Sequence, residues 1–152
     1  GLTKSLAEDY ITQKLKNFSI IRSSWIYSNK KDSFIKKIIN KIKKKKKIFG
    51  IVDSYSGPTS TKNLTGAIKF IIDNKINKKI LHFCDGYRIS PYNFIMKILS
   101  ISERKKYPLK KAYYKNIKFL AKRPKESYLG VSKELRNIKS LTLDQQIKFF
   151  IK

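Results

Sequence analysis

The sequence is short of the residues that form disulfides and bind metals. It contains one cysteine, one histidine and only ten acidic residues among 152. The lone cysteine, Cys84, excludes an intramolecular disulfide and agrees with a reducing compartment. No cluster of Cys or His has the spacing of metal ligands, so no residue is assigned to a metal site.

Long apolar runs are absent as well. No stretch approaches the roughly 18 apolar residues of a membrane-spanning helix, and nothing resembles a signal peptide. We therefore expect a soluble, cytoplasmic protein with no membrane partner. The length fits one domain, and no internal repeat or long linker divides the chain.

Positive charge dominates what is present. The formal net charge of +26 favours a nucleic-acid partner at first sight, because cations release counterions from phosphates. Yet Lys outnumbers Arg by 31 to 5 and Ile outnumbers Val by 23 to 2. A phosphate- or base-reading site should enrich Arg, whose planar group binds bidentately. The composition is instead typical of drift in an AT-rich genome, and nucleic acid is not the expected partner.

A run of five lysines, Lys43–Lys47, leaves an alternative open. Five adjacent cations can form a patch for RNA or anionic lipid. The apolar residues just before the run recur at helical spacing, however, and cations are favourable at a helix C-terminus. The run is therefore interpreted as the end of a helix.

Segments with the apolar pattern of a strand alternate with segments that have the pattern of a helix, which predicts an α/β fold. Helices are expected at residues 2–16, 31–47, 91–101, 131–137 and 142–151, and strands at 18–21, 48–52, 80–84 and 116–121. The first helix should bury Leu6 and Tyr10, and the strand that follows it should be buried. Ser60 or Thr61 is expected to cap a further helix, whose apolar face carries Leu64, Ala67, Ile68, Ile71 and Ile72. Residues 54–60 and 102–114 are expected to be loops.

Two chemically reactive residue types occur once each within an apolar strand. His82 has no evident carboxylate partner in the sequence, so a hydrogen-bonded core histidine is favoured over an acid or base. Cys84 is interpreted as a buried small hydrophobic residue rather than a reactive thiol.

The first 27 residues resemble a segment of the short-chain dehydrogenase/reductases. Gly1-Leu2-Thr3-Lys4 with Glu8, followed by Ile20-Ile21-Arg22-Ser23-Ser24-Trp25-Ile26-Tyr27, is similar to the part where a Tyr-x-x-x-Lys pair leads a helix and the next strand ends beside the sugar and nicotinamide. The tyrosine is expected one place before Gly1. The resemblance therefore implies that the N-terminal cofactor-binding half of the fold, with its glycine-rich turn, lies upstream.

Further landmarks narrow the family. Val52-Asp53, Gly57-Pro58-Thr59, Leu81-His82-Phe83, Ser90-Pro91-Tyr92-Asn93-Phe94 and Arg123-Pro124-Lys125-Glu126-Ser127-Tyr128-Leu129 follow in order. Over nearly the whole chain this series is similar to the C-terminal half of dTDP-4-dehydrorhamnose reductases. The implied fold for 1–152 is the C-terminal part of a Rossmann-like short-chain reductase with a small substrate-binding subdomain.

This resemblance implies an oxidoreductase of cell-surface polysaccharide biosynthesis. The family reduces the 4-keto carbon of a dTDP-linked deoxysugar with NADPH or NADH, giving dTDP-L-rhamnose. A tyrosine donates a proton while a lysine four residues later lowers its pKa and holds the cofactor ribose. Lys4 matches that lysine; the alternative is a solvated surface lysine. The resemblance also implies a possible homodimer, and some relatives use Mg²⁺, for which no residue is assigned.

The resemblance also implies a set of residues that contact the dTDP-sugar. Trp25 would line the pocket, although a core aromatic is the competing interpretation. Ser24 and Tyr27 lie near Trp25, just after the end of the same strand. Gly57, Pro58 and Thr59 would shape the substrate side of the pocket, unless they form a plain turn. Arg123 is a candidate for the diphosphate, against a surface ion pair. The substrate-binding candidates are therefore Ser24, Trp25, Tyr27, Gly57, Pro58, Thr59 and Arg123.

Rival functions remain at this point. Reductase-like proteins also serve as non-catalytic regulatory subunits of methionine adenosyltransferase, and a small basic RNA-binding protein is a third hypothesis. The chain departs from the reductase pattern in lacking a tryptophan in its last helix and in the basic residues 102–114. Without the upstream half we expect it to be inactive and to aggregate or fold marginally.

Overall fold

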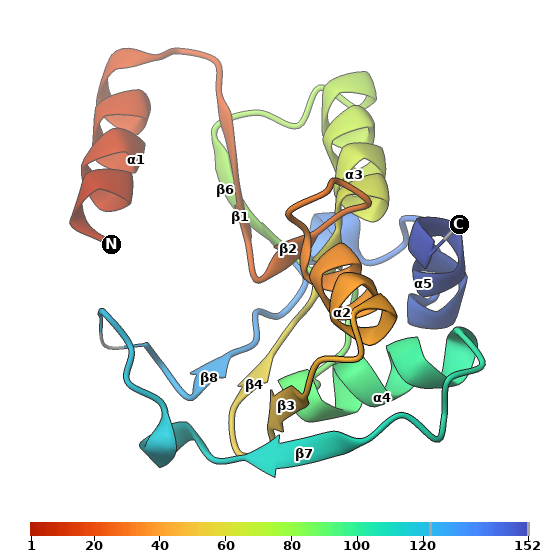
Figure 1. Cartoon of the computed structure of the whole chain (residues 1–152). Helices are drawn as coiled ribbons and strands as arrows, with labels where there is room; N and C mark the ends of the chain where they lie inside the picture. The colour runs from red at the N-terminus through yellow and green to blue at the C-terminus, as the bar shows by residue number, and fades with distance from the viewer. Residues whose placement is uncertain (122, 152) are drawn as a thin grey trace.

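The computed structural model describes residues 1–121 and 123–151 of the chain, and its helices and strands alternate (Figure 1). The α-helices in these residues are α1 (Leu2–Lys14), α2 (Phe34–Lys43), α3 (Thr61–Asp73), α4 (Pro91–Ile101) and α5 (Leu143–Ile151). The strands are β1 (Ser19–Ser23), β2 (Ile26–Tyr27), β3 (Ile48–Ile51), β4 (Tyr55–Ser56), β5 (Thr59–Ser60), β6 (Lys79–Phe83), β7 (Leu109–Ala112) and β8 (Glu126–Ser127). Short 3₁₀ turns lie at Tyr114–Asn116 and Lys133–Leu135.

All strand ladders of the described chain are parallel. They pair β1 with β6, β2 with β5, β3 with β7 and β4 with β8. Parallel neighbours need crossover connections, and here these contain the helices. The α/β class predicted from the sequence is confirmed.

The core has two parts. In the larger, α5 packs against α2 and α4, and these two helices pack against β3, around Ile35, Phe94 and Ile147, which are fully buried. In the smaller, α3 covers β6 through Ala67 and Ile71 against Leu81. Apolar burial of this kind stabilises by about 25 cal/mol per Å² removed from water.

Serine and threonine caps fix several helix starts. Ser60, expected with Thr61 as a cap, and Ser90 accept hydrogen bonds from the amides of Asn63 and Asn93 at 3.0 and 3.2 Å. Before α5, Thr142 and Gln145 bond reciprocally, at 3.3 Å from the Gln145 amide to Thr142 Oγ1 and 2.9 Å from the Thr142 amide to Gln145 Oε1. These contacts satisfy amides that a helix start leaves unpaired.

The lysine run ends α2 as expected, but the predicted helix 31–47 was too long. Lys43 is the last residue of α2, and Lys44–Lys47 form the turn into β3. The amides of Lys44 and Lys45 still bond to carbonyls of the last helical turn, at 3.0 Å each. Residues Lys43–Lys47 are all exposed.

Other predictions of secondary structure were wrong as well, and the helix expected at 131–137 is only the 3₁₀ turn Lys133–Leu135. The supposed loop 102–114 contains β7, which pairs with β3 from Ile48↔Leu109 to Ile51↔Ala112. The strand expected at 116–121 is absent from those residues, where the chain instead leaves a 3₁₀ turn. Residues 54–60 contain the two-residue strands β4 and β5, because their partners β8 and β2 approach from distant parts of the chain.

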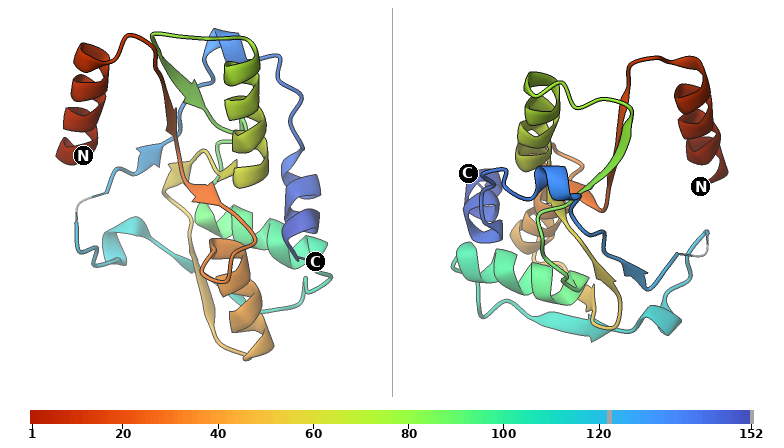
Figure 2. Two further views of the ribbon diagram at one scale, coloured as in Figure 1. Left: turned by 90° about the horizontal axis from the view of Figure 1, so that it is seen from above. Right: turned by 180° about the vertical axis from the view of Figure 1, so that it is seen from behind.

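Helix α1 stands apart from both core clusters. Figures 1 and 2 show it on the opposite side of the β1–β6 pair from α3, in all three views. None of its residues is buried, and the predicted burial of Leu6 and Tyr10 was wrong, since they are 57% and 65% exposed. Strand β1, expected to be buried, is only partly so.

One helix face was also only partly predicted. On α3, Ala67 and Ile71 are buried, whereas Ile68 and Ile72 are exposed. Within the described ranges, no helix is both long and apolar enough to cross a membrane.

Candidate functional site

A cleft of about 660 Å³ opens where β1 ends and β4 and β8 meet. In parallel sheets, ligands bind beyond the carboxyl ends of the strands, so this is the favoured position for a substrate. Its lining combines serine hydroxyls, aromatic rings and one guanidinium. The residues are Ser23, Ser24, Trp25, Phe34, Ile51, Ser54, Ser56, Pro91, Tyr114, Phe119, Arg123, Pro124, Ser127 and Leu129.

Ser24 and Trp25 lie at the floor of the cleft. The Ser24 hydroxyl donates to the Ser127 carbonyl at 2.6 Å, which ties the end of β1 to β8. Trp25 is half-buried and packs its ring at 4.8 Å from Phe34 and 5.2 Å from Phe94, measured between centroids. Trp25 therefore packs against the core and also lines the cleft, and its contact with a substrate stays a prediction.

The segment Gly57-Pro58-Thr59 supports the cleft from behind rather than lining it. The Thr59 amide donates to the Trp25 carbonyl at 3.0 Å, so this segment holds the backbone of the tryptophan. All three residues are buried. A Cβ atom at Gly57 would lie 3.1 Å from the Tyr128 ring and 3.4 Å from Cys84, so the position fits only glycine without local movement.

Tyr27 lies in the core and outside the cleft lining. It is 2% exposed, and its hydroxyl donates to Gln146 Oε1 and lies 3.5 Å from Asp85 Oδ2. Burial first, and the nearby Asp85 charge second, raise the pKa of this phenol far above its ordinary value. The side chain is therefore a neutral donor in a buried network.

Arg123 lines the outer part of the cleft. Its guanidinium lies 5.5 Å from the centroid of the Phe119 ring, and it takes part in no ion pair among residues 1–121 and 123–151. The Tyr114 hydroxyl donates to the Arg123 carbonyl, and the Tyr114 and Phe119 rings lie 5.1 Å apart. An unpaired guanidinium beside a cleft is suited to bind phosphate oxygens.

The aromatic pair Tyr114–Phe119 was missed by the sequence analysis. Its position depends on Asp53, whose Oδ1 accepts a hydrogen bond from the Tyr114 amide at 2.6 Å. That bond is the main cause that lowers the pKa of the Asp53 carboxyl. The sequence signal for this pair is the aromatic content around residue 114. It was overlooked because a loop was predicted at 102–114 and a strand at 116–121.

Lys4 is exposed on α1 and does not belong to the cleft lining. Because α1 and β1 are joined by a short connection and run in opposite directions, the start of α1 lies at the same end as the exit of β1 (Figure 1). Glu8, one helical turn after Lys4, is bound by Arg22 of β1. Lys4 is therefore carried on the helix face that approaches the strand leading into the cleft.

The single cysteine, Cys84, and the single histidine, His82, have different environments. The Cys84 thiol is buried and donates to the Leu129 carbonyl at 2.8 Å, and burial raises its pKa, which confirms its structural role. His82 is only half-buried, so the prediction that this histidine lies in the core was wrong. In the described part of the chain, no three His, Cys, Asp or Glu side chains come together in a way that could hold a metal ion.

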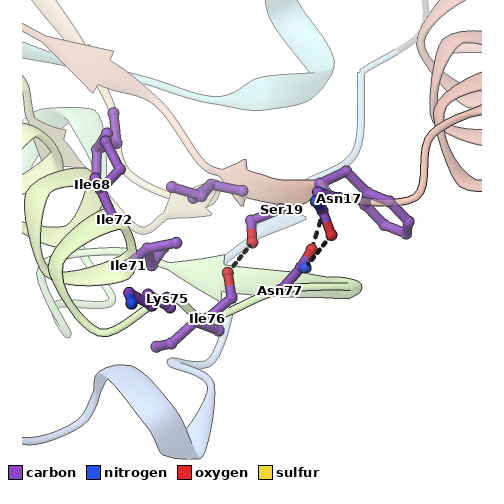
Figure 3. Close-up of a pocket in the computed structure, with 10 residues that line it drawn as sticks. Asn17, Ser19, Ile68, Ile71, Ile72, Lys75, Ile76 and Asn77 are labelled. Atoms are coloured by element: carbon purple, nitrogen blue, oxygen red, sulfur yellow. Dashed lines mark hydrogen bonds between the residues drawn. The ribbon is translucent and has the colours of Figure 1, made fainter.

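A second depression of about 600 Å³ lies between β1 and α3 (Figure 3). Its polar groups bond to one another: Ser19 Oγ donates to the Ile76 carbonyl at 2.5 Å and Asn77 Nδ2 donates to Asn17 Oδ1 at 2.7 Å. The rest of the wall is mostly isoleucine, with Phe18 and Lys75 beside Ile21, Ile68, Ile71, Ile72 and Ile76. An apolar wall with a self-satisfied polar rim suits packing against another structural element better than catalysis.

Comparison with known proteins gives one family across the chain. Residues 1–151 match the model of the RmlD substrate binding domain. In the curated set, the Bacillus subtilis spore coat polysaccharide biosynthesis protein SpsK is 31% identical over 68 residues, which are 45% of this chain and 24% of that protein.

Solved structures agree with this match. A dTDP-4-dehydrorhamnose reductase from Clostridium acetobutylicum superposes with a TM-score of 0.89 at 24% identity, over 99% of this chain and 54% of that one. The Bacillus anthracis reductase, solved with NADP, gives 0.88 at 21% identity over 99% and 53%. A hypothetical dTDP-4-dehydrorhamnose reductase from Sulfolobus tokodaii gives 0.73 at 28% identity over 95% and 51%. The chain thus has the fold of these proteins and spans about half their length.

Proposed function

Since the chain belongs to the RmlD substrate binding domain family, we propose that it is the substrate-binding half of a dTDP-4-dehydrorhamnose reductase. In this proposal the whole protein uses NADPH or NADH to reduce dTDP-4-dehydro-L-rhamnose to dTDP-L-rhamnose, a precursor of cell-surface polysaccharide, in the cytoplasm. The comparisons favour this function over a regulatory subunit of methionine adenosyltransferase, because the relatives named above are reductases and a polysaccharide biosynthesis protein.

The cleft at the exit of β1 is the observation that carries the proposal. It offers serine hydroxyls for sugar hydroxyls, the Trp25 ring for the apolar face of a deoxysugar, and Arg123 for a diphosphate. Ser24, Trp25 and Arg123, three of the candidates named from sequence, line this one cavity. Thr59, which follows Gly57 and Pro58, acts through its bond to the backbone of Trp25, and Tyr27 acts through its buried bonds to Gln146 and Asp85.

The chemistry of Lys4 completes the proposal. A bound nicotinamide cofactor would supply the hydride. Lys4 is exposed and in no ion pair across the described ranges, so its ammonium is available to hold the cofactor ribose and to stabilise the anionic form of an upstream tyrosine. No step is assigned to Mg²⁺, because the described residues offer no three-ligand set for it.

The open side of the molecule supports an upstream cofactor-binding half. The outer edge of β6 is covered by Ser132, whose amide donates to the His82 carbonyl at 2.9 Å, whereas β1 has β6 as its one strand neighbour in the described chain. Beside that edge lies the isoleucine-lined depression of Figure 3. We propose that the cofactor-binding half adds its sheet to β1 and covers this depression, and that the whole protein forms a homodimer.

Binding of the product tests the substrate-binding part of this proposal. Calorimetric titration of the full-length protein with dTDP-L-rhamnose should show binding that weakens about tenfold or more in Arg123→Ala, because a bidentate phosphate contact is lost. The matched control is Arg136→Ala, an exposed arginine outside the cleft. Equal affinity of wild type and Arg123→Ala would remove Arg123 from the site, and an absence of binding by the wild type would reject the proposed substrate.

A further inference from the structure

The contact between α1 and the rest of the chain is centred on one ion pair. Helix α1 has no buried residue, and Glu8 and Ile11 are its two half-buried ones. Arg22 Nε lies 3.1 Å from each carboxylate oxygen of Glu8, and Arg22 Nη2 lies 2.5 Å from Oε2. A bidentate pair of this kind fixes orientation as well as distance.

Helical geometry places Lys4 on the face that this pair anchors. Lys4, Glu8 and Ile11 are spaced four and three residues apart, so they share one face of α1. The exposed apolar residues of α1, Leu2, Leu6 and Tyr10, lie on the opposite face. Arg22 is followed along the chain by Ser23 and Ser24, which line the cleft. The pair thus joins the helix face of Lys4 to the strand that enters the site.

In this geometry Lys4 and Arg22 compete for the Glu8 carboxylate. A glutamate four residues after a lysine is a natural ion-pair partner on a helix surface. Here both oxygens of Glu8 are taken by Arg22, whose hydrogen bonds are the main cause that lowers the pKa of the Glu8 carboxyl. His82, in register with Arg22 on β6, adds a smaller effect of the same sign. Lys4 is left without an ion-pair partner in the described chain.

We infer that Arg22 is a positioning residue that withdraws Glu8 from Lys4, so that the Lys4 charge remains available to cofactor and proton donor. The inference rests on the proposed reductase function. It assigns no contact with substrate to Arg22. It follows that the loss of activity in an Arg22 variant is caused by the freed Glu8 carboxylate. Removing that carboxylate as well should restore the activity.

The test compares single and double variants of the full-length protein. Arg22→Gln should lower kcat about tenfold or more near neutral pH and shift the limb of the pH profile that reports the proton donor to higher pH, because a carboxylate now neutralises the lysine. It should also weaken NADPH binding, measured by fluorescence. Arg22→Gln combined with Glu8→Gln should restore most of kcat, the pH profile and NADPH affinity. The matched control is Arg88→Gln, which breaks an exposed Arg–Glu pair elsewhere in the chain.

The outcomes separate two failures. A wild type without turnover overturns the proposed function and this inference with it. An active wild type whose double variant is as impaired as Arg22→Gln overturns the inference alone, because the pair would then serve only to hold α1 in place. An Arg22→Gln variant indistinguishable from the Arg88→Gln control overturns it as well.

Discussion

At the scale of single residues, Trp25 links the core to the cleft. Its ring packs against Phe34 and Phe94, and its carbonyl accepts the Thr59 amide. The site therefore takes its rigidity from the main core cluster and from a buried backbone segment. Substitutions behind Trp25 should affect stability before they affect chemistry.

Gly57 offers a direct check of this support. Gly57→Ala should lower the free energy of unfolding by about 1 kcal/mol, because the new methyl group would lie 3.1 Å from the Tyr128 ring, which must shift by a few tenths of an ångström. The control is Gly66→Ala on the exposed face of α3, where a Cβ meets no atom within 4 Å. That change should stabilise by about 0.5–1 kcal/mol through helix propensity. Denaturant titration of both variants measures the contrast, and a neutral Gly57→Ala would refute the crowding.

Asp85 makes stability depend on pH in an unusual direction. Its carboxylate accepts the Ser60 amide at 2.8 Å and Asn63 Nδ2 at 3.0 Å, yet burial outweighs these bonds and raises its pKa. The folded state therefore binds the Asp85 proton more tightly than the unfolded state. That contribution is present below the unfolded pKa of about 4 and is lost as pH rises through the folded pKa.

A comparison of wild type with Asp85→Asn isolates this effect. The free energy of unfolding of the wild type, minus that of the variant, should fall as pH rises above about 4, by at most about 1.4 kcal/mol per pH unit. Carboxyls with lowered pKa values, such as Asp53 and Glu134, act in the opposite direction but cancel in the difference. Chemical denaturation from pH 4 to 7 measures it. If the difference in the free energy of unfolding instead grows as pH rises, the hydrogen bonds to Asp85 lower its pKa more than burial raises it, and the prediction is wrong.

At the scale of elements, local signals explain which predictions succeeded. Helix starts at Ser60 and Ser90 were predictable because a capping hydroxyl and Pro91 act within one turn. Strand β7 was not, because Lys110 and Lys111 have no apolar alternation and the segment is a strand through its pairing with β3. The same holds for β4 and β8, each two residues long. In the cleft, Ser24 and Trp25 followed from the strand exit, whereas Tyr114 and Phe119 required the folded chain.

The start of α5 tests a local signal of the same type. Thr142→Ala should destabilise the fold by about 1 kcal/mol, because the Gln145 amide loses its acceptor at 3.3 Å. Thr142→Ser should keep most of that stability, since its hydroxyl can replace the bond. Thermal unfolding followed by circular dichroism distinguishes the two variants. Equal melting temperatures for Thr142→Ala and wild type would rule out a stabilising cap.

At the scale of the whole molecule, the described chain has one covered side and one open side. The helices α2, α4 and α5 share one core cluster, whereas β1 keeps a free edge, with α1 on one side of the β1–β6 pair and the isoleucine-lined depression on the other, between β1 and α3 (Figures 1 and 3). Free strand edges and apolar walls favour association. The solved relatives are about twice as long as this chain, and the cofactor-binding half proposed above would lie against β1.

The isolated chain should therefore self-associate. We expect the 152 residues, expressed alone, to elute as aggregates or to lack a cooperative thermal transition. Ile68→Lys with Ile72→Lys should reduce the aggregated fraction, because both side chains are exposed at the open side. Met96→Lys, at an exposed position on α4, serves as the control. Light scattering after size exclusion measures the effect, and a monomer with a sharp unfolding transition would contradict the expectation.

The most direct test of the central claim is turnover by the full-length protein. NADPH oxidation should be followed with dTDP-4-dehydro-L-rhamnose for wild type, Lys4→Ala and the control Lys37→Ala, an exposed lysine on α2. Wild type and control should turn over, and Lys4→Ala should lose about 100-fold or more of that activity. A wild type that binds NADPH but does not oxidise it with this substrate, or a Lys4→Ala variant that keeps full activity, would contradict it.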